Sequence, residues 1–178
     1  MSTHFRRLSL GQGASLCIFG SLVALALLII APRVRLFPIN ALLVLVAWFC
    51  LWFFSHDLAH HLVGRIFGVA FRYYFLGRSA ITKLGLPIVS NAMRLVPVLG
   101  LKIDKLSLSS VSPSRVRAMY ASGAVSSMFL PWLAIPAGYA VNLPVGILIT
   151  TLTIANDVFT LYFSVQVGDL HRARMVRS

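Results

Sequence analysis

The chain has 178 residues, of which 58% are hydrophobic and only 11% are charged, with a mean hydropathy of +0.87. A soluble domain is about 45–50% apolar and about 25% charged, and a disordered chain has low hydrophobicity, so both classes are excluded. The 16 Lys and Arg face four acids, all of them Asp, for a net charge of +12. Because the basic residues lie between apolar runs, they indicate membrane topology rather than nucleic-acid binding.

Four apolar runs are long enough to cross a bilayer, which takes about 20 helical residues. We expect transmembrane helices at about 14–31, 39–67, 116–139 and 145–167, within a single membrane domain that covers residues 1–178. No small-x-small cleavage site follows the first run, so we expect it to remain as a span rather than to be removed as a signal peptide.

Residues 69–113 separate the second and third spans and contain Gly, Ser and Pro breaks with short alternating pieces. Alternation is typical of strands, so we predict an interfacial β-hairpin or small sheet here. Four spans put both termini on one side, together with 14 of the 16 basic residues. The positive-inside rule then predicts an integral protein of the cell membrane, with both termini and this segment in the cytoplasm, next to anionic lipid and without nucleic acid.

The second span contains an unusual polar group, His56-Asp57-Leu58-Ala59-His60-His61. Ionisable residues inside a span are costly, so each is a functional candidate. His56 and His60 are four residues apart, on one helix face about one turn apart, and can bind one metal ion together. Asp57 lies beside that metal, where it can take a proton from a water molecule bound to it. For His61 we expect a structural or orienting role.

Two other interpretations of these histidines are open. They could be packing histidines that hydrogen-bond between helices. His56, His60 and His61 also match the HxxxHH box of membrane desaturases and hydroxylases. Those di-iron sites take histidines from several boxes, whereas this chain has five in all, which argues against that class.

The same segment resembles the HExxH motif of the site-2 protease family of intramembrane metalloproteases. In that family the motif is followed by a small residue and then by Gly before a hydrophobic residue, and Gly64 and Gly68 match this register. Asp57 takes the position of the family's Glu. The resemblance implies one Zn²⁺ ion held by His56 and His60, with Asp57 as the general base.

Two later segments are similar to family landmarks. Residues 122–127, Ser-Gly-Ala-Val-Ser-Ser, resemble a small-residue motif on the next span. The last core span of the family carries an Asn and then a ligating Asp, for which this chain offers Asn156 and Asp169. The resemblance covers about residues 39–178. It implies that Asp169 is the third metal ligand and that Asn156 orients the substrate or stabilises an oxyanion.

Asp157 is the runner-up for the third ligand, and depth in the membrane discriminates between the two acids. At 1.5 Å per helical residue, Asp169 lies roughly 4 Å inward of Arg172, whereas Asp157 lies roughly 22 Å inward. His60 lies roughly 7 Å inward of its own cytoplasmic flank. Asp169 therefore fits the level of the histidines better, although pairing with Arg172 at the membrane surface is an alternative role for it.

The resemblance implies a site-2 protease-like endopeptidase that hydrolyses peptide bonds in or near the transmembrane segments of membrane-anchored protein substrates. An exposed strand edge in residues 69–113 could hold the extended substrate by strand addition. The alternative is a non-catalytic relative that acts as a membrane scaffold or binding protein, which the substitution at Asp57 favours. A metal or proton transport component is a third class, made less attractive by the absence of an internal repeat.

Overall fold

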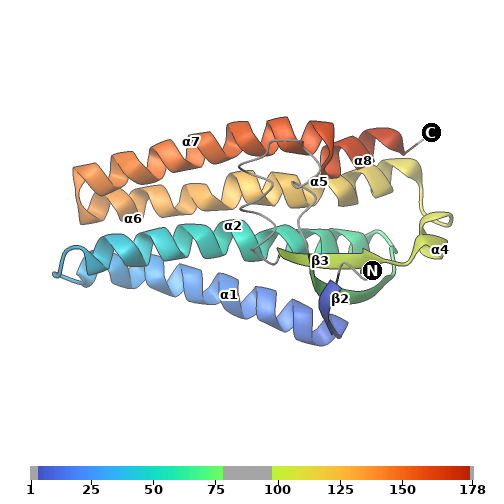
Figure 1. Ribbon diagram of the computed structural model, residues 1–178, viewed down its shortest axis with the longest axis horizontal. Helices are drawn as coiled ribbons and strands as arrows, with labels where there is room; N and C mark the ends of the chain where they lie inside the picture. The colour runs from blue at the N-terminus through green and yellow to red at the C-terminus, as the bar shows by residue number, and fades with distance from the viewer. Residues whose placement is uncertain (1–3, 78–97, 177–178) are drawn as a thin grey trace.

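A computed structural model describes residues 4–77 and 98–176, with side chains from Arg6 onward. Part of the predicted interfacial segment, residues 78–97, lies outside the described residues. The described chain is mostly helical, as predicted, and its helices run side by side along the long axis (Figure 1). Four helical stretches are long and apolar enough to cross a membrane: Leu10–Arg33, Ile39–Ile66, Pro113–Val141 and Leu143–Met175.

The first pair of helices packs through small residues. Helix α1 (Leu10–Ile30) begins at Ser9, whose Oγ accepts a hydrogen bond from the Gln12 N–H while the Gln12 side chain accepts one from the Ser9 N–H. This capping box starts the helix four residues before the predicted span. The buried face of α1 consists of small residues: Gly13, Cys17, Gly20 and Ala24. Gly20 and Ala24 let α2 (Ile39–Ile66) approach closely, whereas Gly13 makes room for the Tyr74 ring.

The outer faces of the four long helical stretches are apolar and exposed. Phe19, Leu22 and Val158 are each more than half exposed. A soluble protein rarely presents so continuous an apolar surface, and a lipid bilayer is the environment that matches it. The exposed pattern thus agrees with the hydropathy of the helices.

The second half of the bundle is interrupted at two places. Helix α5 (Pro113–Phe129) passes into a 3₁₀ turn at Leu130–Leu133 and then into α6 (Ala134–Val141). Helix α7 (Leu143–Gln166) ends before a short helix α8 (Asp169–Met175). The Ser164 hydroxyl accepts a hydrogen bond from the Leu170 N–H across this second break. The break turns the chain so that Asp169 begins a new helix instead of continuing α7.

A small sheet lies at the end of the bundle where α8 also lies (Figure 1). Strand β2 (Phe71–Gly77) pairs antiparallel with both β1 (His4–Leu8) and β3 (Val98–Ile103), in the order β1-β2-β3. The sheet contains the predicted hairpin of residues 69–113, and it adds β1 from the N-terminus, which the sequence analysis did not predict. Gly68, at a φ of +85°, makes the turn from α2 into the sheet.

Two connections complete the described chain. A single 3₁₀ turn at Ala31–Arg33 follows α1. The short helix α4 (Lys105–Leu108) follows β3, and Asp104 accepts a hydrogen bond from the Leu106 N–H at its start. The Asp104 carboxylate also lies 2.9 Å from the Arg72 guanidinium, at the exposed surface. These polar contacts lie on the sheet end, away from the interior of the bundle.

Candidate metal centre

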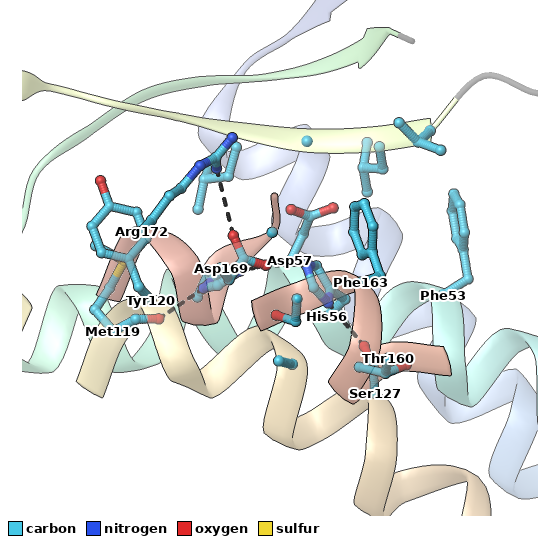
Figure 2. A pocket seen from close by; sticks show the side chains of 18 of the residues that line it. Phe53, His56, Asp57, Met119, Tyr120, Ser127, Thr160, Phe163, Asp169 and Arg172 are labelled. Atoms are coloured by element: carbon cyan, nitrogen blue, oxygen red, sulfur yellow. Dashed lines mark hydrogen bonds and ion pairs between the residues drawn. The ribbon is translucent and has the colours of Figure 1, made fainter. Parts of the chain in front are cut away.

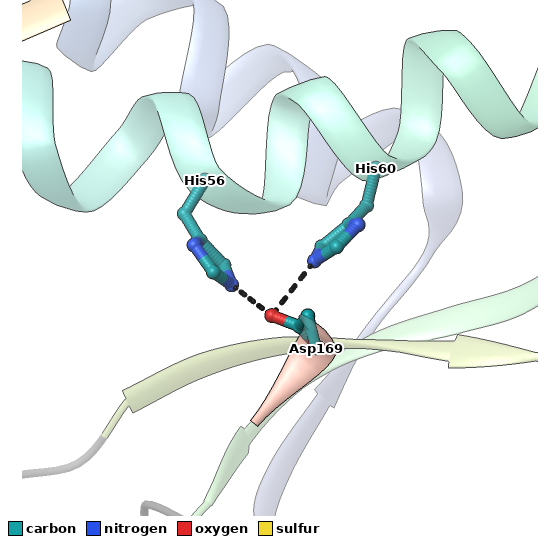
Figure 3. Close-up of side chains that lie close together, drawn as sticks. All are labelled: His56, His60 and Asp169. Atoms are coloured by element: carbon teal, nitrogen blue, oxygen red, sulfur yellow. Dashed lines mark ion pairs between the residues drawn. The ribbon is translucent and has the colours of Figure 1, made fainter. Parts of the chain in front are cut away.

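Helix α2 presents two imidazole rings on one face, as their spacing predicts. The ring centroids of His56 and His60 are 4.9 Å apart and the rings are nearly perpendicular. Both Nε2 atoms point away from α2 toward the start of α8, where Asp169 lies (Figure 3). Two elements more than 100 residues apart in the sequence therefore meet at this point.

The Asp169 carboxylate contacts both rings through one oxygen. Its Oδ2 lies 3.1 Å from the His56 Nε2 and 3.3 Å from the His60 Nε2. One ligand atom from each of the three residues lies within 4.8 Å of the other two, so the group could hold a metal ion. Two ligands, each about 2.0–2.1 Å from a tetrahedral zinc ion, are separated by about 3.3 Å, which is close to the two observed distances between Nε2 and Oδ2.

The other nitrogen of each ring is anchored to α5. The His60 Nδ1 lies 2.8 Å from the Met119 carbonyl oxygen, and the His56 Nδ1 lies 2.8 Å from the Ser127 hydroxyl (Figure 2). A carbonyl only accepts, so Nδ1 of His60 carries the proton and donates it. In a neutral ring this leaves a lone pair on Nε2, which is the tautomer that a metal-binding histidine needs.

If both rings are neutral and donate from Nδ1, acceptor atoms face one another at the centre. With Nδ1 protonated, the Nε2 lone pair of His60 faces a lone pair of the Asp169 carboxylate at 3.3 Å. The Ser127 hydroxyl can accept from His56 in the same way, which aims a second ring lone pair at the same oxygen. Repulsion among these atoms is relieved by an additional proton or by a metal ion between them.

The small-residue stretch of α5 makes room for the rings. A Cβ atom at Gly123 would lie only 2.2 Å from the His60 Nε2, so this position accepts glycine alone without displacing the ring. The Ser126 hydroxyl donates to the Ser55 carbonyl oxygen at 3.1 Å, one residue before His56. Residues 122–127, which resemble the family's small-residue motif, therefore form a surface that packs against α2.

A cavity of about 290 Å³ adjoins the centre and is bounded by α2, α5, α7 and the sheet. Its walls are mostly apolar, with Phe53, Phe163 and Leu101 among the lining side chains. The Asp57 side chain points into this cavity beside Asp169 (Figure 2). Asp57 is only 5% exposed, and no hydrogen bond or ion pair to its carboxylate is found within residues 4–77 and 98–176.

The remaining histidines of the described region lie away from the centre. His61 turns toward the sheet, where its Nδ1 lies 2.8 Å from the Tyr74 hydroxyl. Tyr74 is fully buried, and this burial, followed by the nearby Cys17 and Asp57, raises the pKa of its hydroxyl, which keeps the proton in place for the hydrogen bond. His171 is exposed on α8 and lines a separate groove.

The two acids considered for the third ligand, Asp157 and Asp169, occupy different positions. Asp157 accepts a hydrogen bond from the Trp132 Nε1 at 3.0 Å, in a contact between helices, and it is not part of the three-residue group. Asp169 also lies 3.5 Å from Arg172, so the surface pairing considered for it exists beside the contacts with the histidines. Exposed pairs of this kind contribute roughly 0–1 kcal/mol.

Asn156 contacts Ser127, the same residue of α5 that contacts His56. Its side-chain amide donates to the Ser127 carbonyl oxygen at 3.0 Å, and it is not among the residues that line the cavity. Its suggested role in substrate binding stays a prediction. Sequence reasoning did not identify Met119, because it acts through a backbone carbonyl that every residue has, and it did not identify Ser127 as the partner of His56.

Comparison of the chain with protein-family models, with curated proteins and with solved structures gives no match. The chemistry of the site is therefore inferred from its own residues. Two imidazoles and a carboxylate could hold a metal ion, and a second buried carboxylate and an apolar cavity lie beside them.

Proposed function

We propose that the protein is an intramembrane metallopeptidase similar to the site-2 proteases, which cleaves membrane-anchored proteins in or near their transmembrane segments. The observation that carries this proposal is the convergence of the two Nε2 atoms on Asp169, with their Nδ1 atoms anchored to α5. Intramembrane polar groups without a function are costly, and these are three in one place.

The donor set fits zinc. Catalytic zinc sites use three protein ligands and leave one position open, and two histidines with one carboxylate are such a set. The cavity on the Asp57 side supplies room for the open position. When bound there, zinc would lower the pKa of a coordinated water molecule and polarise the scissile carbonyl. The protein's own contribution is to hold the three ligands in place through Met119 and Ser127.

Asp57 is the group that we assign to proton transfer. It directly follows a ligand, lines the same cavity, and has no competing ion-pair partner among the described residues. A general base must reach the proton that it abstracts, and its place next to the open position is suitable for this. The same carboxyl group would then return the proton to the leaving amine of the cleaved peptide bond.

Strand β3 offers a way to hold an extended substrate. It is one of the two edge strands of the described sheet, and residues Val98 to Leu101 line the cavity. A substrate helix has its amides satisfied internally, so it must unwind before cleavage, and strand addition would satisfy the freed amides. The apolar cavity walls then accept side chains from a transmembrane segment.

A second candidate is a metal-binding relative without peptidase activity. The observation that favours it is Asp57 itself, because Asp is one methylene shorter than the Glu of the HExxH motif and reaches less far toward the metal. Both candidates share the metal site, the four membrane spans and the cytoplasmic termini, and they differ only in proton transfer.

Metal analysis of the purified protein tests the shared part. We expect about one zinc ion per chain, lost in His56→Ala and Asp169→Asn. Two matched controls remove the same chemical groups elsewhere: His171→Ala on the surface of α8, and Asp157→Asn within α7. Full metal occupancy in Asp169→Asn, or equal loss in Asp157→Asn, would contradict the assigned ligands.

Cleavage of a single-span membrane reporter in proteoliposomes separates the two candidates. The peptidase candidate requires activity in the zinc-loaded wild type and its loss in Asp57→Asn, with zinc still bound. Asp57→Glu should retain activity, because it restores the family's residue. Activity in Asp57→Asn equal to the wild type would remove Asp57 as the base, and an inactive wild type with activity gained in Asp57→Glu would favour the non-catalytic candidate.

A further inference from the structure

A second groove lies at the sheet end of the bundle, next to the cavity that adjoins the candidate metal centre. This feature, the α5–α8 groove, is an open depression of about 540 Å³ between α4, the start of α5 and α8. Its floor is apolar and includes Val111, Val116 and Met175. Its polar side is formed by His171 and Arg172 of α8.

The charge around the groove favours an anion. No carboxylate lines it among the described residues, whereas the Arg172 guanidinium, 56% exposed, stands at its edge. Arg117 lies next to it and donates to the carbonyl oxygen of Val176, one of the lining residues, at 2.9 Å. The only acid within ion-pair reach of Arg172 in the described region is Asp169, at 3.5 Å.

The position of the groove specifies the kind of anion. Pro113 begins one candidate span and Met175 ends another, so the groove lies where two spans leave the apolar layer. In the proposed topology this is the cytoplasmic surface, at the level of lipid phosphates. An apolar floor with a guanidinium at its rim matches a phospholipid, whose acyl chains begin a few bonds from its phosphate.

We propose that the α5–α8 groove binds an anionic phospholipid, with Arg172 and His171 donating hydrogen bonds to its phosphate and Val116 and Met175 contacting the start of an acyl chain. A phosphate monoester with two negative charges, as in phosphatidic acid, suits this pair better than the single charge of a diester.

The groove and the cavity beside the candidate metal centre share two lining side chains. Arg172 and Tyr120 line both, so they form the wall between them. A phosphate that pairs with Arg172 competes with Asp169 for the same guanidinium. Lipid binding would therefore release the carboxylate for the metal, a consequence that rests on the proposed metal site.

Lipid binding is measured on the full chain in neutral detergent micelles with chelator present, so that the result does not depend on the metal. The probe is spin-labelled phosphatidic acid, compared with spin-labelled phosphatidylcholine. We expect tighter binding of phosphatidic acid, reduced about fivefold in Arg172→Gln, since one such contact contributes about 1 kcal/mol. His171→Gln, an exposed change that does not challenge the fold, should reduce it as well. Arg174→Gln removes the same charge from α8 outside the groove and should change binding less than twofold.

Three outcomes would overturn the proposal. One is equal affinity for the two lipids, and another is a loss in Arg174→Gln as large as that in Arg172→Gln, which would show diffuse charge attraction only. The third is displacement of the labelled lipid by millimolar inorganic phosphate alone, which would assign the groove to a soluble phosphate instead of a lipid.

Discussion

Replacing Gly123 by alanine tests whether α5 positions His60, one of the proposed metal ligands. An added Cβ would lie 2.2 Å from Nε2, 2.5 Å from Cε1 and 2.7 Å from Cδ2 of His60. All three are ring atoms, so no rotation about a flexible side-chain end relieves the contact. Either the ring leaves its place or α5 moves away from α2.

The size of the displacement follows from these distances. Ordinary van der Waals contact begins at about 3.4 Å, so the ring and the new methyl group must separate by at least about 1.2 Å. A movement of that size breaks the 2.8 Å hydrogen bond from Nδ1 to the Met119 carbonyl, or it carries Nε2 away from Asp169. Loss of such an orienting partner typically lowers metal affinity 10- to 100-fold, or about 1.4–2.7 kcal/mol.

Zinc affinity, measured by competition with a chromophoric chelator, gives the readout for Gly123→Ala. The matched control is Gly11→Ala on α1, where the added methyl group meets nothing within 4 Å. Alanine favours helix over glycine by up to about 1 kcal/mol, so a general loss of helix is not expected in either variant. Wild-type zinc affinity in a folded Gly123→Ala protein would refute the assignment of His60 as a ligand held by α5.

Three further changes separate the metal site from its surroundings. Arg172→Gln in lipid-free micelles should raise zinc affinity by up to about fivefold, because it removes a cation 3.5 Å from Asp169; a fall in affinity would contradict this. Tyr74→Phe should lower the unfolding free energy by about 1–3 kcal/mol, because it leaves the His61 Nδ1 without its buried partner; an unchanged melting temperature in detergent would count against that bond. Trp48→Phe removes the 2.9 Å hydrogen bond to Thr153 and should cost about 1 kcal/mol with zinc affinity intact; reduced zinc binding would show that the two regions are coupled.

The helices could be predicted from sequence because each is specified by its own composition. Apolar runs of sufficient length identify them without reference to any partner, and only their ends were misplaced. The start of α1 was readable from Ser9 and Gln12, three residues apart, which form a capping box. Strand β1 was not predictable in this way, since it is paired through β2, more than 60 residues away, and no local alternation marks it.

In the candidate site, too, the residues specified by local sequence could be predicted, whereas the backbone and hydroxyl contacts that depend on a distant element could not. His56 and His60 were recognisable because both lie on one helix, where spacing alone fixes their relative position. Asp169 comes from a different element, and it was favoured by its depth in the membrane and by the resemblance to the last core span of the family. The break between α7 and α8, made by Gly168 and the Ser164 hydroxyl, was not predicted, although it sets the direction of Asp169. The Met119 carbonyl could not be found from sequence, because a backbone group carries no residue-specific signal.

The distribution of satisfied and unsatisfied polar groups distinguishes this centre from the rest of the bundle. Within the apolar layer, polar side chains are paired in closed contacts, as in Trp48 with Thr153 and Trp132 with Asp157. The Ser55 hydroxyl, next to His56, is by contrast fully buried without a hydrogen-bond partner in the described chain.

At His56, His60 and Asp169, neutral rings that donate from Nδ1 would set ring lone pairs against a carboxylate oxygen. A helix-packing role needs complementary pairs, which the other contacts show that this bundle forms. The centre becomes complementary when either a proton or a metal ion lies between the rings and the carboxylate. This difference is the reason to expect that zinc binding stabilises the fold, with an unfolding midpoint that rises with zinc concentration.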